Sequence, residues 1–405
     1  MLLITEPTVL GKIGLMFGIY LHIPFCRRRC KYCDFITYAG KDDLMPEYIA
    51  ALISEIRHQA KSLENLPGKV DTIFFGGGTP SLLKAEWVQD LIDHIRHEFD
   101  LAENPEISLE ANPGTLTQGS LARLLEAGVN RLSIGTQSFN DRDLKLLGRI
   151  HNPSQAIDAV LSARQSGFSN ISLDLMFGIP GQSLPDWRAN LERAVALGLN
   201  HLSLYSLILE AGTQLFDEVE SGKMHPASDD LSADMYELAM DELGKQGFSH
   251  YEISNWSRGE AFEARHNKIY WKNQPYLGVG AGAHSSLNGL RVANTPSIEE
   301  YIHKVNDLQF SLEGAFPAAE ETLQLETYTM QQETMMLGMR LTREGVSTLD
   351  FHERYGVTIN QVFPEELERI ITRKLAEWRA FPDGPHLVLT RRGRLLGNQV
   401  FQEFV

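Results

Sequence analysis

The stretch of sequence that decides the fold surrounds the cysteines of the chain. Residues 17–33 read FGIYLHIPFCRRRCKYC, and this run contains all three cysteines, Cys26, Cys30 and Cys33. The segment Ile19–Ile23 just before them has the composition of a buried strand. An odd number of cysteines packed into one loop is not a disulfide framework, and such a cluster of thiols usually binds a metal or carries out redox chemistry. The sequence therefore predicts a strand that leads directly into a metal-binding loop.

The composition is that of a globular protein. The 405 residues suffice for two or three domains, and 43% hydrophobic against 22% charged residues is ordinary for a chain with a sizeable core. A formal net charge of −16 argues against binding to nucleic acid or to anionic membranes, since both are negatively charged. No apolar run of about 18 residues occurs, which predicts that no segment crosses a membrane. Because Glu6, Pro7 and Lys12 interrupt the apolar start, we expect no signal peptide, a cytoplasmic protein, and a first residue at either Met1 or Met16.

Strand and helix patterns alternate through the first half of the chain. Between the strand-like runs, apolar residues recur at steps of three and four, as in Met45–Ile56 and Trp87–Ile95, which indicates amphipathic helices. Alternation of this kind predicts parallel βαβ units of the α/β class, and six units rather than eight predict a partial (β/α)6 barrel. The six expected strands are Ile19–Ile23, Val70–Phe75, Ile107–Glu110, Arg131–Gly135, Ile171–Met176 and His201–Leu207.

The pattern changes after Glu210. A long helix is expected over Asp229–Leu243, followed by an irregular stretch rich in glycine and aromatic residues from Tyr251 to Asn294. In the tail we expect helices near Gln331–Gly338 and Pro364–Trp378, a strand-like run His386–Thr390 and a turn through Arg391–Arg394, which together resemble a winged-helix module. The predicted division is a barrel of residues 1–215, an α/β extension of residues 216–320 and a small C-terminal module of residues 321–405.

Each predicted barrel strand ends in glycine or in polar side chains. In a barrel of parallel strands these carboxyl ends share one edge, where ligands bind, so six separate segments are expected to meet at one pocket. Glycines without a Cβ let the backbone approach a ligand closely. The segments that follow the strands are the cysteine loop, Gly76–Pro80, Glu110–Pro113, Gln137, Asp174 with Gly178–Gly181, and Glu210.

The spacing C-x3-C-x2-C narrows the choice of metal. Structural zinc sites usually have four tetrahedral ligands, whereas three thiolates on one short loop suit three corners of a cubane [4Fe–4S] cluster and leave its fourth iron open. Zinc with His22 as a fourth ligand stays an alternative. The neighbouring cations are expected to lower the thiol pKa values and to offset the thiolate charge. These cations are Arg27, Arg28, Arg29 and Lys31.

With an aromatic residue, Tyr32, just before the third cysteine, the loop resembles the signature of the radical S-adenosylmethionine (radical-SAM) superfamily. The resemblance implies that the open iron binds the amino and carboxylate groups of S-adenosylmethionine and that the reduced cluster cleaves it to a 5′-deoxyadenosyl radical. The protein would supply orientation and a shielded pocket.

Four further segments resemble the branch of this superfamily that contains oxygen-independent coproporphyrinogen III dehydrogenases and radical-SAM haem chaperones. They are Tyr20–Cys26, Phe75–Pro80, Arg131–Phe139 and Asp174–Pro180, and the resemblance extends through the C-terminal module. The resemblance implies contacts of S-adenosylmethionine with Tyr20, Tyr32, Gly78, Thr79, Glu110, Gln137, Arg149, Asp174 and Ile208.

Three features favour the chaperones within this branch. Phe35 stands where the dehydrogenases carry a fourth cysteine, and only 25 residues precede Cys26, fewer than in the dehydrogenases. The run His266–Trp271 resembles the H-N-x-x-Y-W motif of the chaperones, in which His266 would ligate haem iron and the aromatic residues would pack on the porphyrin. His284, in a second glycine-rich loop, is expected to be structural. The resemblance therefore implies a haem chaperone that delivers haem to a client protein, and the alternative is the dehydrogenase. A homodimer is a further expectation.

Overall fold

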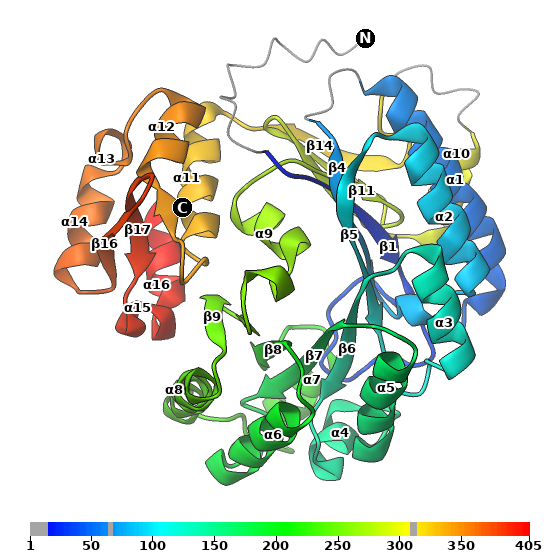
Figure 1. Ribbon diagram of the computed structural model, residues 1–405, viewed down its shortest axis with the longest axis horizontal. Coiled ribbons are helices and arrows are strands. Elements are labelled where there is room, and N and C mark those ends of the chain that lie inside the picture. Colours follow the sequence, from blue (N-terminus) through cyan, green and yellow to red (C-terminus); the bar gives the residue numbers. More distant parts are fainter. Residues whose placement is uncertain (1–14, 64–67, 308–313) are drawn as a thin grey trace.

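One large sheet organises most of the chain. The computed structural model describes residues 15–63, 68–307 and 314–405 (Figure 1), so Met1 lies outside the described residues. Six neighbouring strands of this twelve-stranded sheet are parallel and follow one another in chain order. They confirm the predicted partial barrel and its six strands. Their bounds are β1 (Phe17–Ile23), β4 (Val70–Gly77), β5 (Leu101–Ala111), β6 (Arg131–Gln137), β7 (Asn170–Phe177) and β8 (His201–Ser206).

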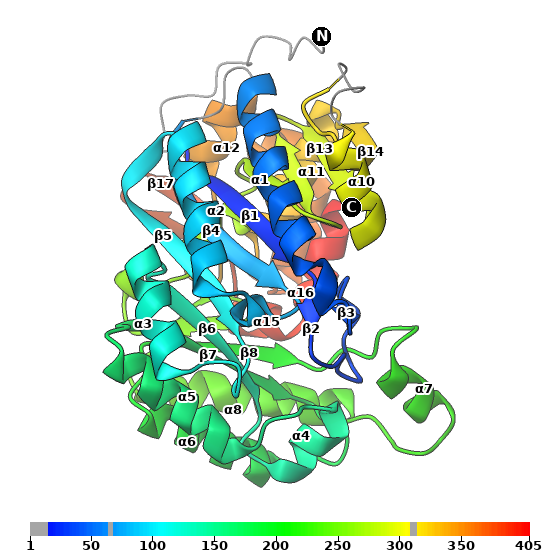
Figure 2. The same ribbon diagram turned by 90° about the vertical axis from the view of Figure 1, so that its right-hand side faces the viewer.

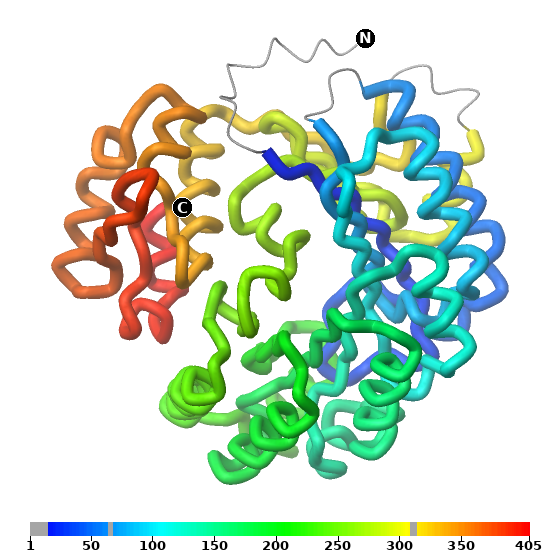
Figure 3. Tube along the Cα trace, viewed as in Figure 1, coloured from blue at the N-terminus to red at the C-terminus, as the bar shows by residue number. Residues whose placement is uncertain are grey.

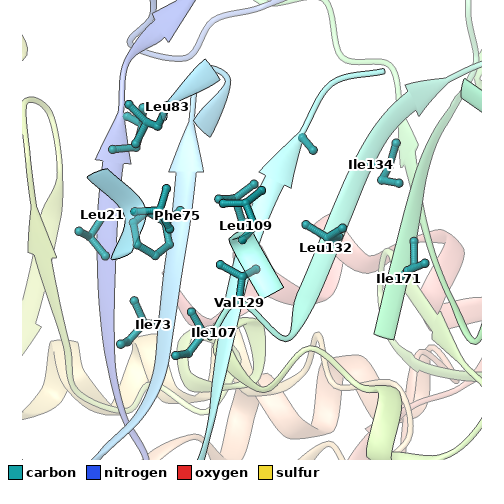
Figure 4. Packing of buried hydrophobic residues seen from close by; sticks show 14 of the residues in the cluster. Leu21, Ile73, Phe75, Leu83, Ile107, Leu109, Val129, Leu132, Ile134 and Ile171 are labelled. Atoms are coloured by element: carbon teal, nitrogen blue, oxygen red, sulfur yellow. The ribbon is translucent and has the colours of Figure 1, made fainter. Parts of the chain in front are cut away.

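The two faces of these strands differ in chemistry because side chains alternate along a strand. On the outer face, alternate positions such as Leu21, Phe75 and Leu109 are apolar and fully buried, and Figure 4 shows them packed side by side across the strands. The intervening positions, such as Glu110 and Asp174, point to the concave side. The barrel core therefore lies between sheet and helices, and the inside of the barrel keeps its polar groups for a site.

Helices cover the outer face of the barrel (Figure 2), and local signals set their ends. Side chains of Thr117, Asn152 and Ser183 cap the N-termini of three of them and form capping boxes, and Gly128 ends the first of these in the left-handed conformation. The covering helices are α1 (Met45–Ser62), α2 (Ala85–Glu98), α3 (Gln118–Ala127), α4 (Asp141–Leu147), α5 (Pro153–Gln165) and α6 (Leu184–Ala196).

The sheet continues beyond the barrel on both sides. β11 pairs in parallel with β1, and β10 pairs antiparallel with β8. The stretch predicted to be irregular therefore contains strands, which were missed because each is short and is formed by pairing with a distant segment. Gly278 is required here, since a Cβ would lie 2.1 Å from the carbonyl oxygen of His284. The added strands are β9 (Ser249–Glu252), β10 (Asn255–Ser257), β11 (Tyr276–Val279), β12 (His284–Leu287), β13 (Leu290–Asn294) and β14 (Ala319–Gln324).

The described residues between 216 and 320 contribute to the same core as the barrel. The helix α8 (Asp229–Lys245), which agrees with its prediction, and α10 (Ile298–Asn306) contribute Met235 and Tyr301 to that core. The short helix α9 (Arg265–Trp271) instead enters the concave side of the sheet, where it contacts β1 and β4 (Figure 1). It fills the barrel toward the amino ends of the strands, so the open space lies at their carboxyl ends.

The C-terminal module has an apolar core of its own and forms a separate lobe in the chain trace (Figure 3). Its three-stranded antiparallel sheet has the order β15-β17-β16. Two predictions were wrong here. Trp378 lies in a strand that pairs with β17, and Arg391–Arg394 begins a helix that Thr390 caps. The elements are α11 (Thr327–Gly338), β15 (Val346–Ser347), α12 (Thr348–Tyr355), α13 (Ile359–Val362), α14 (Pro364–Thr372), β16 (Ala376–Phe381), β17 (Gly384–Leu389), α15 (Arg391–Leu395) and α16 (Gly397–Phe401).

Among the described helices, none has both the length and the apolar character needed to cross a membrane.

Candidate functional site

A cavity of about 430 Å³ opens at the carboxyl ends of the barrel strands. All three cysteines line it, together with residues from the ends of β4 to β8. Eight of the nine residues expected to contact S-adenosylmethionine lie in its wall, and the ninth, Tyr20, lies outside it. The eight are Tyr32, Gly78, Thr79, Glu110, Gln137, Arg149, Asp174 and Ile208.

Each cysteine thiol has a polar neighbour of its own. Cys26 ends the short strand β2 (Phe25–Cys26), which pairs with β3 (Tyr38–Ala39), and its Sγ lies 3.5 Å from Oγ1 of Thr79. Sγ of Cys33 lies 3.9 Å from Oγ1 of Thr37, and Sγ of Cys30 accepts from Nη1 of Arg149 at 3.4 Å. The pairing of β2 with β3 closes the loop on itself and turns the thiols toward one cavity.

The expectation that nearby cations lower the thiol pKa values is wrong for two cysteines. Burial raises the pKa of Cys26 and of Cys33 above the ordinary value. The reason is that Arg27 and Arg28 are exposed, so they do little to offset the cost of burying a thiolate. The cations near the loop therefore do not offset the effect of burial on the pKa of these two thiols.

The arrangement suits a group larger than a single ion. Among residues 15–63, 68–307 and 314–405, no three side chains of His, Cys, Asp or Glu converge on one metal-ion position. His22, the alternative fourth ligand for zinc, has both ring nitrogens occupied: Nδ1 lies 3.0 Å from the hydroxyl of Tyr20 and Nε2 lies 2.9 Å from the carbonyl oxygen of Ile36. Three thiols spaced around a cavity of this volume fit the corners of a polynuclear cluster.

The glycines after β4 are needed by the protein backbone as well as by any ligand. A Cβ on Gly78 would lie 2.7 Å from the carbonyl oxygen of Phe25, and the Gly78 amide donates to the carbonyl oxygen of Ile23 at 2.8 Å. Gly77 has a φ of +111°, which favours glycine, and its amide donates to Oε2 of Glu110 at 3.1 Å. The glycines thus bring β4 into contact with the strand that carries the cysteine loop.

Two half-buried carboxyl groups lie in the wall of the cavity. Burial and the nearby Asp174 raise the pKa of Glu110 to about 8. Burial likewise raises the pKa of Asp174, although Ser133 donates to its two carboxylate oxygens at 2.9 and 3.1 Å. Two carboxyl groups with raised pKa values favour a cationic ligand, because such a ligand allows both to ionise.

Arg149 is a half-buried cation in the wall of the cavity. Its Nη2 donates to the carbonyl oxygen of Gly135 at 2.6 Å and to the side-chain oxygen of Asn112, whose amide in turn donates to Oγ1 of Thr79 at 2.8 Å. Burial by itself would lower the pKa of Arg149, but Tyr32 and Cys30 raise it overall. Among the described residues, the buried Nε has no hydrogen-bond partner, so Arg149 keeps one donor for an anionic group of a ligand.

The remaining wall residues set the shape of the cavity mouth. Gln137 ends β6 with a φ of +66°, which turns its side chain out of the strand direction. Ile208 and Phe35 are 66% and 63% exposed. Large apolar side chains left this open beside a cavity indicate a surface that meets a ligand or another protein.

Several wall residues were missed by sequence reasoning. Ser133 and Gln137 are an even number of residues apart on one predicted strand, as are Asp174 and Met176 on another. Side chains spaced in this way lie on the same face of a strand, so the strand period could have identified Ser133 and Met176. Tyr205 carried no signal beyond its place near a strand end. Asn112, which belongs to the expected segment Glu110–Pro113, does lie in the wall, and the missed residues include Ser133, Met176 and Tyr205.

His266 lies below the cavity and not in its wall. It is 1% exposed and stacks on Phe74 with ring centroids 5.0 Å apart. Nδ1 lies 2.7 Å from Oγ1 of Thr72 and Nε2 lies 2.8 Å from the hydroxyl of Tyr270, so both ring nitrogens are hydrogen-bonded. Burial lowers the pKa of His266 to about 3, which keeps the imidazole neutral. The other motif aromatic, Trp271, packs under the guanidinium of Arg340.

Comparison with known proteins agrees with the fold. Residues 20–194 match the family model described as Radical SAM superfamily, and residues 330–396 match HemN C-terminal domain. A solved structure of Escherichia coli coproporphyrinogen III oxidase (HemN), a radical SAM enzyme, superimposes with a TM-score of 0.80 over 96% of this chain and 90% of that one; at 21% identity it shows the shared fold.

Sequence relatives extend over nearly the whole chain. A Bacillus subtilis protein named heme chaperone HemW is 39% identical over 96% of this chain and 99% of its own length. A Mycobacterium tuberculosis protein of the same name is 37% identical over 96% of this chain and 94% of its own length. A mitochondrial radical S-adenosyl methionine domain-containing protein 1 from Danio rerio is 33% identical over 93% of this chain and 82% of its own. With relatives this similar along almost its full length, the chain belongs to the HemW family of radical-SAM proteins.

Proposed function

We propose that the protein is a haem chaperone that carries a [4Fe–4S] cluster and S-adenosylmethionine. The observation that carries the proposal is that Cys26, Cys30 and Cys33 open into one cavity beside two carboxyl groups and a guanidinium, all three half-buried. The three thiols would hold three irons of the cluster, which supplies an open iron and one-electron chemistry when it is bound.

The polar wall of the cavity fits S-adenosylmethionine by charge. Glu110 and Asp174 would face the cationic parts of the ligand, its ammonium and sulfonium, while the unpartnered Nε of Arg149 would donate to its carboxylate. Gln137, Tyr32 and Ile208 complete the wall and would orient the nucleoside. These side chains would bind and orient the ligand and exclude water from it.

Haem binding is proposed from the family and from the motif around His266. Ligation of haem iron by Nε2 of His266 requires that nitrogen to give up its bond to the hydroxyl of Tyr270. The neutral imidazole is in the correct protonation state for ligation. Movement of α9 away from the sheet would expose His266 to haem. Return of α9 to the sheet would release the haem to a client protein.

One experiment separates this function from its alternatives. Anaerobically reconstituted protein should contain iron and acid-labile sulfide, bind haem, and form no protoporphyrinogen from coproporphyrinogen III with reductant and S-adenosylmethionine. Protoporphyrinogen formation would establish the dehydrogenase instead, and zinc without sulfide would exclude the cluster. A homodimer, a cytoplasmic location and the three-domain division stay predictions.

Two variants test the haem ligand. His266→Ala should lower haem affinity at least tenfold, a change typical of losing an axial ligand, whereas Tyr270→Phe should bind haem at least as tightly as the parent because Nε2 is freed. Tyr276→Phe is the matched control, since Tyr276 stacks edge-on against Tyr270 and lacks its bond to His266. Unchanged haem affinity in His266→Ala would show that His266 is not the haem ligand.

A further inference from the structure

The residues between the second and third cysteines are held from outside the loop. Only Lys31 and Tyr32 separate Cys30 from Cys33, so their positions set how these two thiols are spaced. The Lys31 amide donates to the carbonyl oxygen of Leu147 at 3.0 Å, at the end of α4. One side of the loop is therefore attached to the barrel.

A short helix attaches the other side. The amide of Leu215, near the start of α7 (Gln214–Glu220), donates to the carbonyl oxygen of Lys31 at 2.8 Å. Nζ of Lys31 contacts both carboxylate oxygens of Glu218 on the same helix, at 2.8 and 3.1 Å. The backbone and the side chain of one loop residue are thus bound by one helix more than 180 positions along the chain.

An apolar cluster lies beneath these bonds. Leu215 packs with Leu147, Met176 and Ile179, and the ring of Tyr32 packs against the same cluster. It is separate from the main core of the barrel. Leu215 is also the one buried residue of α7 among the described residues, and Figure 2 shows α7 standing away from the helices that cover the barrel. The helix therefore contributes little to the barrel core, and its firm contacts are with the cysteine loop.

We infer that α7 is a clamp on the cysteine loop and that Glu218 is a positioning residue for the metal centre. Glu218 fixes Lys31, and through it the spacing of the thiols of Cys30 and Cys33, without touching the centre itself. The inference rests on the proposal that the cysteines hold a cluster, but the clamp itself is a property of the metal-free protein.

The test compares Glu218→Ala with Glu220→Ala in the full-length protein. Glu220 lies on the same helix and is exposed, and no ion pair involves it among the described residues. In the metal-free protein, alkylation of Cys30 and Cys33, followed by mass spectrometry, should be about threefold faster in Glu218→Ala, the effect expected when one partly exposed ion pair is lost. Glu220→Ala should match the parent.

A second measurement uses the reconstituted protein. Loss of iron to a chelator should be faster in Glu218→Ala than in Glu220→Ala, and Leu215→Ala, which removes the apolar anchor, should act in the same direction. Equal alkylation rates and equal iron loss in the two glutamate variants would overturn the clamp. If the parent protein holds no sulfide, the cluster proposal fails while the alkylation comparison still decides the clamp.

Discussion

The guanidinium of Arg149 donates to the thiol of Cys30 across 3.4 Å, and this contact links the metal-binding loop to the ligand cavity. The same guanidinium bonds to Asn112 and to the carbonyl oxygen of Gly135, so it connects the ends of β5 and β6 with the cysteine loop. Substitution of Arg149 should therefore affect both the thiols of the loop and the binding of the ligand.

Arg149→Lys tests this link. Lysine keeps the charge but cannot supply the forked donors, so affinity for S-adenosylmethionine should fall about tenfold or more, which corresponds to roughly 1.5–3 kcal/mol for a lost charge-assisted hydrogen bond. Calorimetric titration of the reconstituted protein measures the change. Arg123→Lys, an exposed change on α3 that retains its contact with Glu86, is the control, and equal affinities in the two variants would contradict the role of Arg149.

Glu110 predicts opposite pH dependences for stability and for ligand binding. Its pKa rises from 4.5 to about 8 on folding, so the folded protein keeps a proton that the unfolded chain loses. The contribution of Glu110 to the free energy of unfolding is fully present below about pH 4.5 and is lost as the pH rises toward 8. Denaturant unfolding of the ligand-free protein should show this fall, and Glu110→Gln should lack it.

Binding of a cationic ligand should follow the reverse trend, since it favours the ionised form of Glu110. Affinity for S-adenosylmethionine should increase with pH up to about pH 8, by at most about tenfold per pH unit. Titrations in buffers of different ionisation enthalpy should detect the released proton. A flat profile in the parent protein, matching that of Glu110→Gln, would show that the ligand does not face this carboxyl group.

The approach of β4 to the cysteine loop predicts a sharp contrast between two glycines. Gly78→Ala should destabilise the protein by about 1–3 kcal/mol, because its Cβ would meet the backbone of Phe25 at 2.7 Å and of Pro24 at 2.9 Å. Gly119→Ala, in the first turn of α3 with nothing within 4 Å of the added Cβ, should be neutral or slightly stabilising. Denaturant midpoints compare the two, and an unaffected Gly78→Ala would mean that the loop moves freely.

The barrel was predictable because its strands are strongly patterned. Ile171–Met176 lies inside β7 and Val70–Phe75 inside β4, since buried parallel strands are rich in β-branched and aromatic residues. The added strands β11 and β12 were not predictable. Tyr276–Val279, for example, has no strand pattern of its own and forms a strand by pairing with β1. Pairing partners that are distant in sequence leave no local signal.

Some features of the candidate site could likewise be predicted from the sequence and others could not. Glu110 and Asp174 could be placed from the sequence because Glu110 lies near the end of the patterned strand β5 and Asp174 lies within the patterned strand β7. A period of two would have added Ser133. The burial of His266 could not be foreseen, since it depends on Thr72 from β4 and on Glu106 from β5, which accepts from the His266 amide at 3.1 Å. Contacts across the inside of a barrel are visible only after the barrel has closed.

The pairing of β11 with β1 has a consequence for biosynthesis. β1 is the first strand of the described chain and leads into the cysteine loop, yet the neighbour that completes its hydrogen bonds, around Leu277, is translated after the whole barrel. While the nascent chain emerges from the ribosome, one edge of β1 is open and able to pair wrongly. Loading of metal should therefore follow completion of the chain, and truncated products that end before β11 should aggregate.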